Sequence, residues 1–249
     1  MEDWRFKPAA DLGLTPAQRL RSLQREAGLP GAIGQALWWN AMRLYAAAVH
    51  RVRVEGREHL PAEPPFVLVA NHASHLDTIV LMTSLTRAQS RRAFPLAAGD
   101  TFFDAGLSAA FAAGALNALP VWRSRTRRQE IDALRARLAD DRCIFILFPE
   151  GTRTRSGEMG AFKPGLGALV AGSEIPVVPA YLDGCWRALP PQRKLPRPLP
   201  IAVRFGPALR FADRANDKDG WHAVAAASEA AVRTLGGLAP RGPAPPAAS

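Results

Sequence analysis

A histidine and an aspartate five positions apart are the first candidates for chemistry in this sequence. His72 and Asp77 lie in the segment NHASHLD, directly after the apolar run FVLVA. Histidine has an ordinary pKa of about 6.5, which suits it to take and return a proton near neutral pH. An aspartate beside it fixes the ring tautomer and stabilises the imidazolium. The pair therefore indicates general base catalysis at a hydroxyl group.

The spacing of this pair sets a condition on the backbone. Five positions correspond to about 140° on a continuous helix, so the two side chains meet only if His72 precedes the first turn. One alternative is that Asn71 or Ser74 caps the next helix and the histidines serve local backbone groups. Another is a metal bound by His72, His75 and Asp77. No further His, Cys or Glu cluster completes a first shell, so no metal is predicted.

The segment CIFILFPEGTRTRSGEMGAFKPG contains a second candidate site, again where an apolar run ends in a polar loop. Arginine binds phosphate through two donors, lysine adds a compact charge, and glycine lets the backbone approach an oxyanion. The alternative is a solvated charged turn. We predict a site for the substrate phosphate made by Glu150, Gly151, Thr152, Arg153 and Lys163.

A third segment, ALNALPVWRSRTRR, brings Arg123 just past a short strand-like run. Arg123 is predicted to reach the same phosphate. The arginines behind it fit the exposed face of the helix that follows, and this is also the alternative for Arg123 itself.

Strand-like and helical patterns alternate between residues 51 and 236. Runs typical of strands occur at 51–56, 66–70, 94–98, 118–122, 143–148, 176–182 and, as a last extended pair, 201–206 and 208–211. Helical patterns occur at about 78–86, 101–113, 126–140, 165–172 and 218–235. This order predicts an α/β fold, a single domain with a mixed, largely parallel sheet flanked by helices. Sites in such domains form where strands end.

Two helices are predicted before this region. The first begins at Thr15, a capping residue followed by proline, and ends near Gly28. The second covers about 32–50. Along one side it carries a stripe of Trp38, Met42, Tyr45 and Val49, and Trp39 lies beside this stripe. Paired tryptophans near arginines are typical of a helix in the membrane interface. The alternative is a stripe that packs into the protein core.

The chain is predicted to form one folded domain with two flanking segments. Residues 1–50 form a helical, membrane-associating segment and residues 51–236 the main domain, since 249 residues suit one sizeable core. Residues 237–249 are rich in Pro, Ala and Gly, cannot bury a core, and are expected to be a disordered tail.

The composition bounds the partners and the location. A formal net charge of +10 predicts an anionic partner, whether nucleic acid, an acidic membrane or phosphorylated substrates. The best uncharged window, 105–122, is mostly Ala and Gly, so no transmembrane span is predicted. The N-terminus lacks the charged start, apolar core and cleavage site of a secretory signal, so no signal peptide is predicted. The expected location is the cytoplasmic side of the cell membrane. Cys143 and Cys185 follow no metal or redox spacing and are predicted to be buried, inert thiols.

These segments together resemble the lysophosphatidic acid and glycerolipid acyltransferase family. NHASHLD resembles its N-H-x-x-x-x-D block, LPVW with Arg123 the second block, FPEGTR the third and VPAYL the fourth. The second block departs from the commonest form over residues 117–122. The resemblance covers residues 52–206. It implies that His72 is the general base, that Asp77 orients it, and that the acceptor site is shaped by Arg123, Glu150, Gly151 and Arg153.

The resemblance also implies a reaction and its partners. His72 would deprotonate an acceptor hydroxyl that attacks the thioester of acyl-CoA or acyl-ACP directly, without a cofactor. The expected acceptor is a lysophospholipid, in the first place 1-acyl-sn-glycerol 3-phosphate, with lyso-ornithine lipid or glycerol 3-phosphate as alternatives. The expected partner surface is the inner face of the cytoplasmic membrane. Two other classes are a hydrolase using His72, His75 and Asp77 and a basic nucleic-acid-binding protein. The latter lacks a recognisable binding module, so no nucleic acid partner is predicted.

Overall fold

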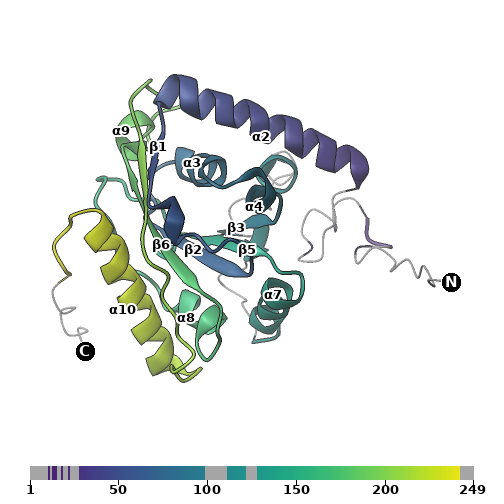
Figure 1. Ribbon diagram of the computed structural model, residues 1–249, viewed down its shortest axis with the longest axis vertical. Coiled ribbons are helices and arrows are strands. Elements are labelled where there is room, and N and C mark those ends of the chain that lie inside the picture. Colours follow the sequence, from purple (N-terminus) through teal and green to yellow (C-terminus); the bar gives the residue numbers. More distant parts are fainter. Residues whose placement is uncertain are drawn as a thin grey trace.

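A twisted sheet with helices on both faces forms the centre of the molecule (Figure 1). The computed structural model describes residues 11, 13–15, 18, 22, 28–98, 111–121 and 128–241. Within those ranges the sheet has seven strands. In spatial order they are β1 (Arg53–Glu55), β7 (Ala202–Phe205), β6 (Val177–Asp183), β2 (Phe66–Ala70), β5 (Ile144–Leu147), β3 (Ala93–Ala98) and β4 (Leu119–Val121).

The sheet is mixed and largely parallel, which confirms the predicted fold class. Every neighbouring pair runs parallel except β6 with β7. The prediction of an extended pair at 201–206 and 208–211 was wrong in one respect. Both segments meet β6 instead of each other, and Leu209 makes only an isolated bridge to Val177.

The helices form two layers around the sheet. In Figure 1, α2, α3 and α4 lie above the sheet and α7, α8 and α10 below it. Their bounds are α2 (Leu29–His50), α3 (Leu76–Ser84), α4 (Arg87–Arg91), α7 (Arg128–Asp140), α8 (Gly165–Val170), α9 (Cys185–Ala188) and α10 (Lys218–Leu235). Two single turns, η1 (Arg57–His59) and η2 (Phe111–Ala115), complete the described elements.

Strand β2 shows why the centre of the sheet reads as a continuous apolar run. All five of its residues are fully buried, because helices cover both faces. Phe66 and Leu68 pack into the core layer on the α2 and α3 side. Val67 and Val69 pack into the opposite layer with α8 and α10. The strand that ends just before His72 is therefore rigidly held.

Helix α2 lays its aromatic stripe on the domain. Trp39 is buried, and Trp38, Met42 and Tyr45 pack against the core cluster beneath them. Of the two interpretations of this stripe, packing against the protein core is therefore the one that the structure supports. The side chains left in solvent are aliphatic and lie on another face: Ile33, Leu37 and Leu44.

Several predicted boundaries differ from the structure. The helix predicted at 78–86 is α3, which begins and ends two residues earlier, and Thr86 forms a capping box with Gln89 that starts a further helix, α4. At the predicted first helix, Thr15 and Gln18 exchange the same reciprocal bonds. Most of that helix, and most of the one predicted at 101–113, lies outside the described residues.

Among the described helices, none combines the length and the apolar character needed to cross a bilayer, and this includes α2 with its 22 residues.

Candidate active site

The two candidate motifs meet because their strands are parallel neighbours. Leu68 pairs with Ile146 and Val69 with Leu147, so β2 and β5 end at the same edge of the sheet. The polar residues that follow each strand therefore leave the sheet side by side. This is the strand-end placement expected for a site in an α/β domain.

His72 and Asp77 form a hydrogen-bonded pair at this edge. His72 Nδ1 lies 2.8 Å from Asp77 Oδ2. The helix α3 begins at Leu76, so Asp77 sits in its first turn and His72 precedes it, as the spacing required. The same oxygen accepts the backbone N–H groups of Ala73 at 2.6 Å and Ser74 at 2.8 Å. Asp77 is fully buried, so this carboxylate is fixed in place.

The pairing defines the tautomer of His72. A carboxylate oxygen offers only acceptor capacity, so Nδ1 carries the hydrogen and Nε2 keeps its lone pair. The His72 side chain is 20% exposed, whereas that of Asp77 is 0% exposed. The arrangement leaves Nε2 able to accept a proton from a hydroxyl group.

The FPEGTR segment holds His72 at three further points. The His72 backbone N–H donates to Glu150 Oε1 at 2.6 Å, and its carbonyl accepts from Thr154 N at 2.9 Å. The imidazole stacks on Phe148 with ring centroids 4.2 Å apart and planes at 18°. Phe148 and Thr154 were not predicted as site residues. A stacking role leaves no signal in the sequence beyond an aromatic residue at a strand end.

Glu150 binds backbone groups. Besides the N–H of His72, its other oxygen accepts Gly160 N at 2.7 Å, so both carboxylate oxygens are engaged. Burial raises the pKa of Glu150, while these two N–H donors act in the opposite direction. The prediction that Glu150 binds the substrate phosphate does not fit this geometry, because a carboxylate with two buried N–H partners offers a phosphate no donor. Its place is that of a positioning residue for the His72 loop.

We expect Glu150→Gln to lower kcat by about 10- to 100-fold, because an amide accepts only one of the two N–H bonds and the His72 loop shifts. The free energy of unfolding should fall by about 1–2 kcal/mol, because one hydrogen bond is lost. The fall is no larger because the variant no longer has to bury a charged group. Steady-state kinetics and urea unfolding measure the two effects. Glu174→Gln is the control, because Glu174 is exposed and pairs only with Arg210 on the surface. Equal kinetics for both variants would contradict the assigned role.

Arg153 stands beside the catalytic pair. Its Nη1 is buried and, within the described chain, has no hydrogen-bond partner. Burial lowers the pKa of this guanidinium, and the Asp77 carboxylate acts against that shift. The pKa of His75 is lowered by burial and further by the charges of Arg153 and His72, which places all four groups in one electrostatic neighbourhood. A guanidinium nitrogen that is buried without a partner can donate to an anionic group that binds there.

The other predicted phosphate residues are partly brought together. Gly151 has φ +75°, and the Lys163 ammonium lies over it, 3.0 Å from where a Cβ would stand. Lys163 N donates to Pro149 O at 2.9 Å, and Lys163 and Thr152 are both exposed. Arg123 lies just beyond β4, in the segment 122–127 that is outside the described residues, and its role stays a prediction.

Asn71 and Ser74 were considered only as helix caps, yet both tie the His72 loop to other segments. Asn71 extends the pairing of β2 with β6 by exchanging two bonds with the Leu182 backbone, at 2.8 and 3.1 Å. Ser74 Oγ accepts from Leu76 N and donates to the Leu189 carbonyl at 2.7 Å. The N-cap of α3 is His75, without a side-chain capping bond, so neither Asn71 nor Ser74 caps the helix as the alternative supposed.

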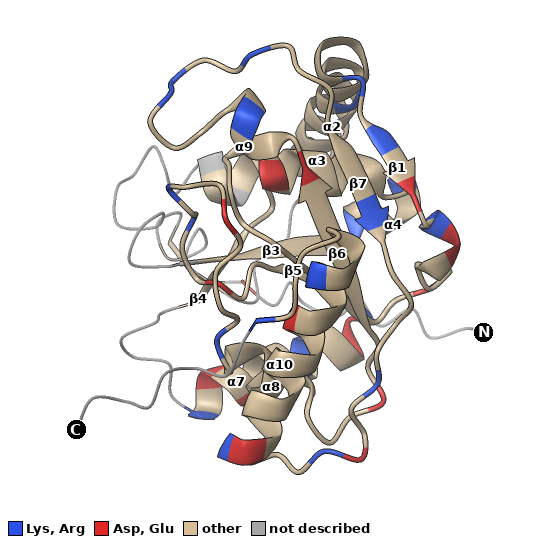
Figure 2. Cartoon of the chain, turned by 90° about the vertical axis from the view of Figure 1, so that its left-hand side faces the viewer, with Lys and Arg blue, Asp and Glu red and all other residues tan. Residues whose placement is uncertain are grey.

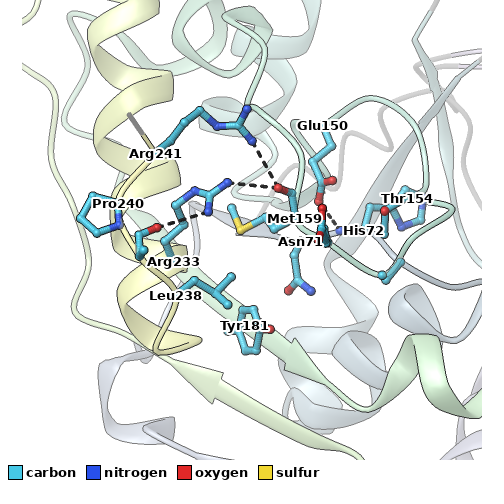
Figure 3. A pocket seen from close by; sticks show the side chains of 14 residues that line it. Asn71, His72, Glu150, Thr154, Met159, Tyr181, Arg233, Leu238, Pro240 and Arg241 are labelled. Atoms are coloured by element: carbon cyan, nitrogen blue, oxygen red, sulfur yellow. Dashed lines mark hydrogen bonds between the residues drawn. The ribbon is translucent and has the colours of Figure 1, made fainter. Parts of the chain in front are cut away.

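A cavity of about 480 Å³ opens beside His72 (Figure 3). Glu150 and Met159 line it from the FPEGTR side, and Tyr181 lines it from β6. Its far wall is the segment 238–241, which follows α10. The cavity is wide enough for part of a substrate, and His72 is one of the residues that line it.

The wall of this cavity corrects the prediction of a disordered tail from residue 237. Arg241 donates from Nε to Glu229 Oε1 at 2.8 Å and from Nη2 to the Met159 carbonyl at 3.2 Å. Figure 3 shows the Arg241 guanidinium directed at Met159. Arg241 holds this segment in place by pairing with the buried Glu229 carboxylate. The Pro and Ala content of the segment gave no sign of this contact. Residues 242–249 lie outside the described residues.

The two cysteines are free and buried, as predicted. Burial raises the pKa of both thiols, and for Cys185 the nearby Asp77 carboxylate raises it further. A neutral, buried thiol is a poor nucleophile. Neither cysteine therefore competes with a reaction in which the acceptor hydroxyl attacks directly.

The sequence model of one family, described as Acyltransferase, matches residues 51–183. The match covers more than half of the chain and both motifs that form the site. The chain belongs to this acyltransferase family. The match begins just before β1 and ends with β6, so it contains the strands from which His72 and Arg153 emerge.

Curated relatives within the family carry more specific names. A chloroplastic 1-acyl-sn-glycerol-3-phosphate acyltransferase of Arabidopsis thaliana is 29% identical over 161 residues, which are 61% of this chain and 41% of that protein. The human 1-acyl-sn-glycerol-3-phosphate acyltransferase alpha is 33% identical over 136 residues, 53% of this chain and 46% of that protein. The chain thus spans less than half the length of these relatives.

A solved structure shares the fold. The 1-acyl-sn-glycerophosphate acyltransferase of Thermotoga maritima superimposes with a TM-score of 0.56 at 21% identity, over 82% of this chain and 81% of that one. The likeness confirms the α/β architecture. Together with the family match, it also confirms the resemblance inferred from the sequence blocks.

Proposed function

We propose that this acyltransferase moves a fatty acyl group from a thioester to the hydroxyl group of a phosphate-bearing lysolipid. His72 Nε2 takes the hydroxyl proton while the hydroxyl oxygen attacks the thioester carbon. The C–S bond then breaks, and the imidazolium returns the proton to the departing thiolate. Asp77 stabilises the positive charge on the ring during this exchange.

The unpartnered Arg153 guanidinium carries the proposal of a phosphate on the acceptor. A cation half-enclosed beside the base, with a buried donor still free, is stabilised when an anionic group binds to it. The exposed Lys163 over Gly151 adds a second positive charge on the same loop. The names of the Arabidopsis and human relatives favour 1-acyl-sn-glycerol 3-phosphate as acceptor and phosphatidic acid as product.

A screen of purified protein tests this assignment. Several acceptors are each combined with radiolabelled acyl-CoA and acyl-ACP: 1-acylglycerol 3-phosphate, glycerol 3-phosphate, lyso-ornithine lipid and 1-acylglycerol. Labelled phosphatidic acid is the expected main product. Release of free fatty acid without transfer to any acceptor would instead indicate a hydrolase.

We expect Arg153→Ala to lower kcat/KM for the phosphate-bearing acceptor by about 100-fold, because a charge-assisted bond to phosphate is lost. The neutral 1-acylglycerol should lose less than about threefold, since it makes no such bond. Arg155→Ala is the matched control, an exposed arginine two positions further on. An equal loss on both acceptors would show that Arg153 supports the fold of the loop instead of binding phosphate.

Helix α2 supports the proposal that the enzyme works at a membrane surface as a peripheral protein of the cytoplasmic side. Apart from its terminal, buried His50, its one basic side chain is Arg43, which turns inward to donate to the Leu85 carbonyl at 2.9 Å, and it has no acidic side chain. The outward face is left uncharged, with Leu37 67% and Leu44 71% exposed. Binding of such a face at the acyl boundary of a lipid leaflet is favourable, because its apolar side chains leave water.

A further inference from the structure

The loop between α9 and β7 concentrates positive charge on the surface. Residues 190–200, with the sequence PPQRKLPRPLP, are called the basic loop below. Arg193, Lys194 and Arg197 are all exposed. No acidic residue occurs in the sequence between Asp183 and Asp213. The loop therefore has an uninterrupted positive potential.

These three cations lack acidic partners in the part of the chain that the structure describes. No ion pair there involves any of them, and the one side-chain bond is from Arg193 Nε to the Leu195 carbonyl at 3.4 Å. Leu195 itself is 74% exposed, the highest exposure among the large apolar side chains described. An exposed leucine between cations is typical of a surface that binds a partner with anionic groups in front of an apolar layer.

The basic loop is a fixed extension of α2. The Leu199 carbonyl lies 3.1 Å from His50 Nδ1, and Ile201 N donates to the His50 carbonyl at 3.0 Å. Arg51, just after α2, donates to the Pro198 carbonyl at 3.4 Å. Figures 1 and 2 both place α2 and the loop after α9 along the top of the molecule, and Figure 2 shows the positive residues on that loop. The loop and the uncharged face of α2 thus share one side.

The inner end of the basic loop reaches the active site. Ser74, two residues after His72, donates to the carbonyl of Leu189, the residue before the loop begins. Arg197 N donates to the Ala188 carbonyl at 2.8 Å and closes the base of the loop. The base of the loop is therefore tied to the segment that carries His72.

We propose that the basic loop docks on the anionic headgroups of a lipid bilayer and orients the active site toward it, with Leu195 inserted at the acyl boundary. Charge complementarity and continuity with the α2 face favour a lipid surface over any other anionic partner. Three cations without protein partners match phosphates spread over a leaflet, and an exposed leucine gains nothing from a soluble polyanion. The inference rests on the proposed function at a membrane.

The test compares binding of the whole protein to two kinds of vesicle, phosphatidylcholine alone and phosphatidylcholine with phosphatidylglycerol. We expect the triple variant R193Q/K194Q/R197Q to bind the anionic vesicles about 100-fold more weakly, at about fivefold per cation. Binding to phosphatidylcholine should change less than about threefold. The control variant R210Q/R214Q/K218Q removes the same charge at the other end of the molecule, near the start of α10 (Figure 1). It should keep nearly all of the binding.

Two outcomes would overturn the inference. One is vesicle binding by the loop variant within threefold of the unmodified protein; the other is an equal loss in the control variant, which would mean that net charge alone acts. Competition by an oligonucleotide at least as strong as by anionic vesicles would assign the loop to nucleic acid instead. Transfer to a short-chain, water-soluble lysophosphatidate should be unchanged in the loop variant, so failure of the docking idea stays separate from failure of the acyltransferase assignment.

Leu195→Ser isolates the apolar part of the same surface. With the three cations intact, it should weaken binding to both kinds of vesicle by about fivefold, because an inserted leucine no longer leaves water. Thermal unfolding should be unchanged, since Leu195 contributes nothing to the core. Unaltered binding would show that the loop contacts headgroups without insertion and would overturn that part of the proposal.

Discussion

Replacing His72 with alanine is expected to lower acyl transfer by about 10⁴-fold, the upper range for loss of a general base. The substitution removes Nε2, which the tautomer fixed by Asp77 leaves free to take the hydroxyl proton. Folding should persist, because the bonds from the His72 backbone to Glu150 and Thr154 do not involve the side chain. Single-turnover transfer of labelled acyl groups measures the loss.

Binding of the lysolipid provides the second measurement on this variant. We expect its Kd to change less than about threefold, because the phosphate would be held by Arg153 instead of by the imidazole. His222→Ala is the control, since His222 is exposed on α10 away from the site. Turnover retained within tenfold in the His72 variant would sink the general base mechanism.

Replacing Asp77 with asparagine is expected to lower kcat by about 10³-fold with little change in KM, as for a loss confined to the transition state. The asparagine carbonyl can still accept from His72 Nδ1, Ala73 N and Ser74 N, so the loop keeps its shape. What disappears is the negative charge that stabilises the imidazolium. Because Asp77 is fully buried, water supplies no substitute.

The readout for this variant combines kinetics with stability. Urea unfolding should shift by no more than about 2 kcal/mol, while kcat falls by orders of magnitude. Asp183→Asn is the matched control, because Asp183 also lies at a strand end but pairs with Arg187 and Arg204 on the surface. A loss of less than tenfold in kcat for Asp77→Asn would limit Asp77 to holding the loop.

The structure joins the two sequence motifs into one unit. Glu150 binds the backbone of His72 and of Gly160, and Phe148 stacks on the catalytic ring. Arg241 then holds the Met159 carbonyl next to Gly160. His72, the proposed base, is thus positioned by residues from three separate parts of the chain.

Local patterns sufficed for much of the fold. The helix predicted at 218–235 matches α10, whose Asp217 caps the first turn. The continuous apolar runs at 66–70 and 143–148 are the buried neighbours β2 and β5. These features could be predicted because capping residues and burial on both faces of a strand act within a few residues.

Contacts between distant segments explain the errors. The aromatic stripe of α2 left both an interface face and a core face open, and the position of Trp39 over the sheet core decides for the core. Glu150 was grouped with the cations of its loop, whereas its partners come from residues 78 positions earlier and 10 positions later. Arg241 was assigned to a tail, although its carboxylate partner lies 12 residues away on α10.

The sequence by itself determined the order of strands and helices and the pair His72 and Asp77, because periodicity and the five-residue spacing are properties of local backbone. Only the tertiary structure decided that Glu150 positions the base, that Arg153 keeps a buried donor without a partner, and that the basic loop lies beside α2. Each of these depends on which side chains face each other after parallel strands bring remote loops to one edge.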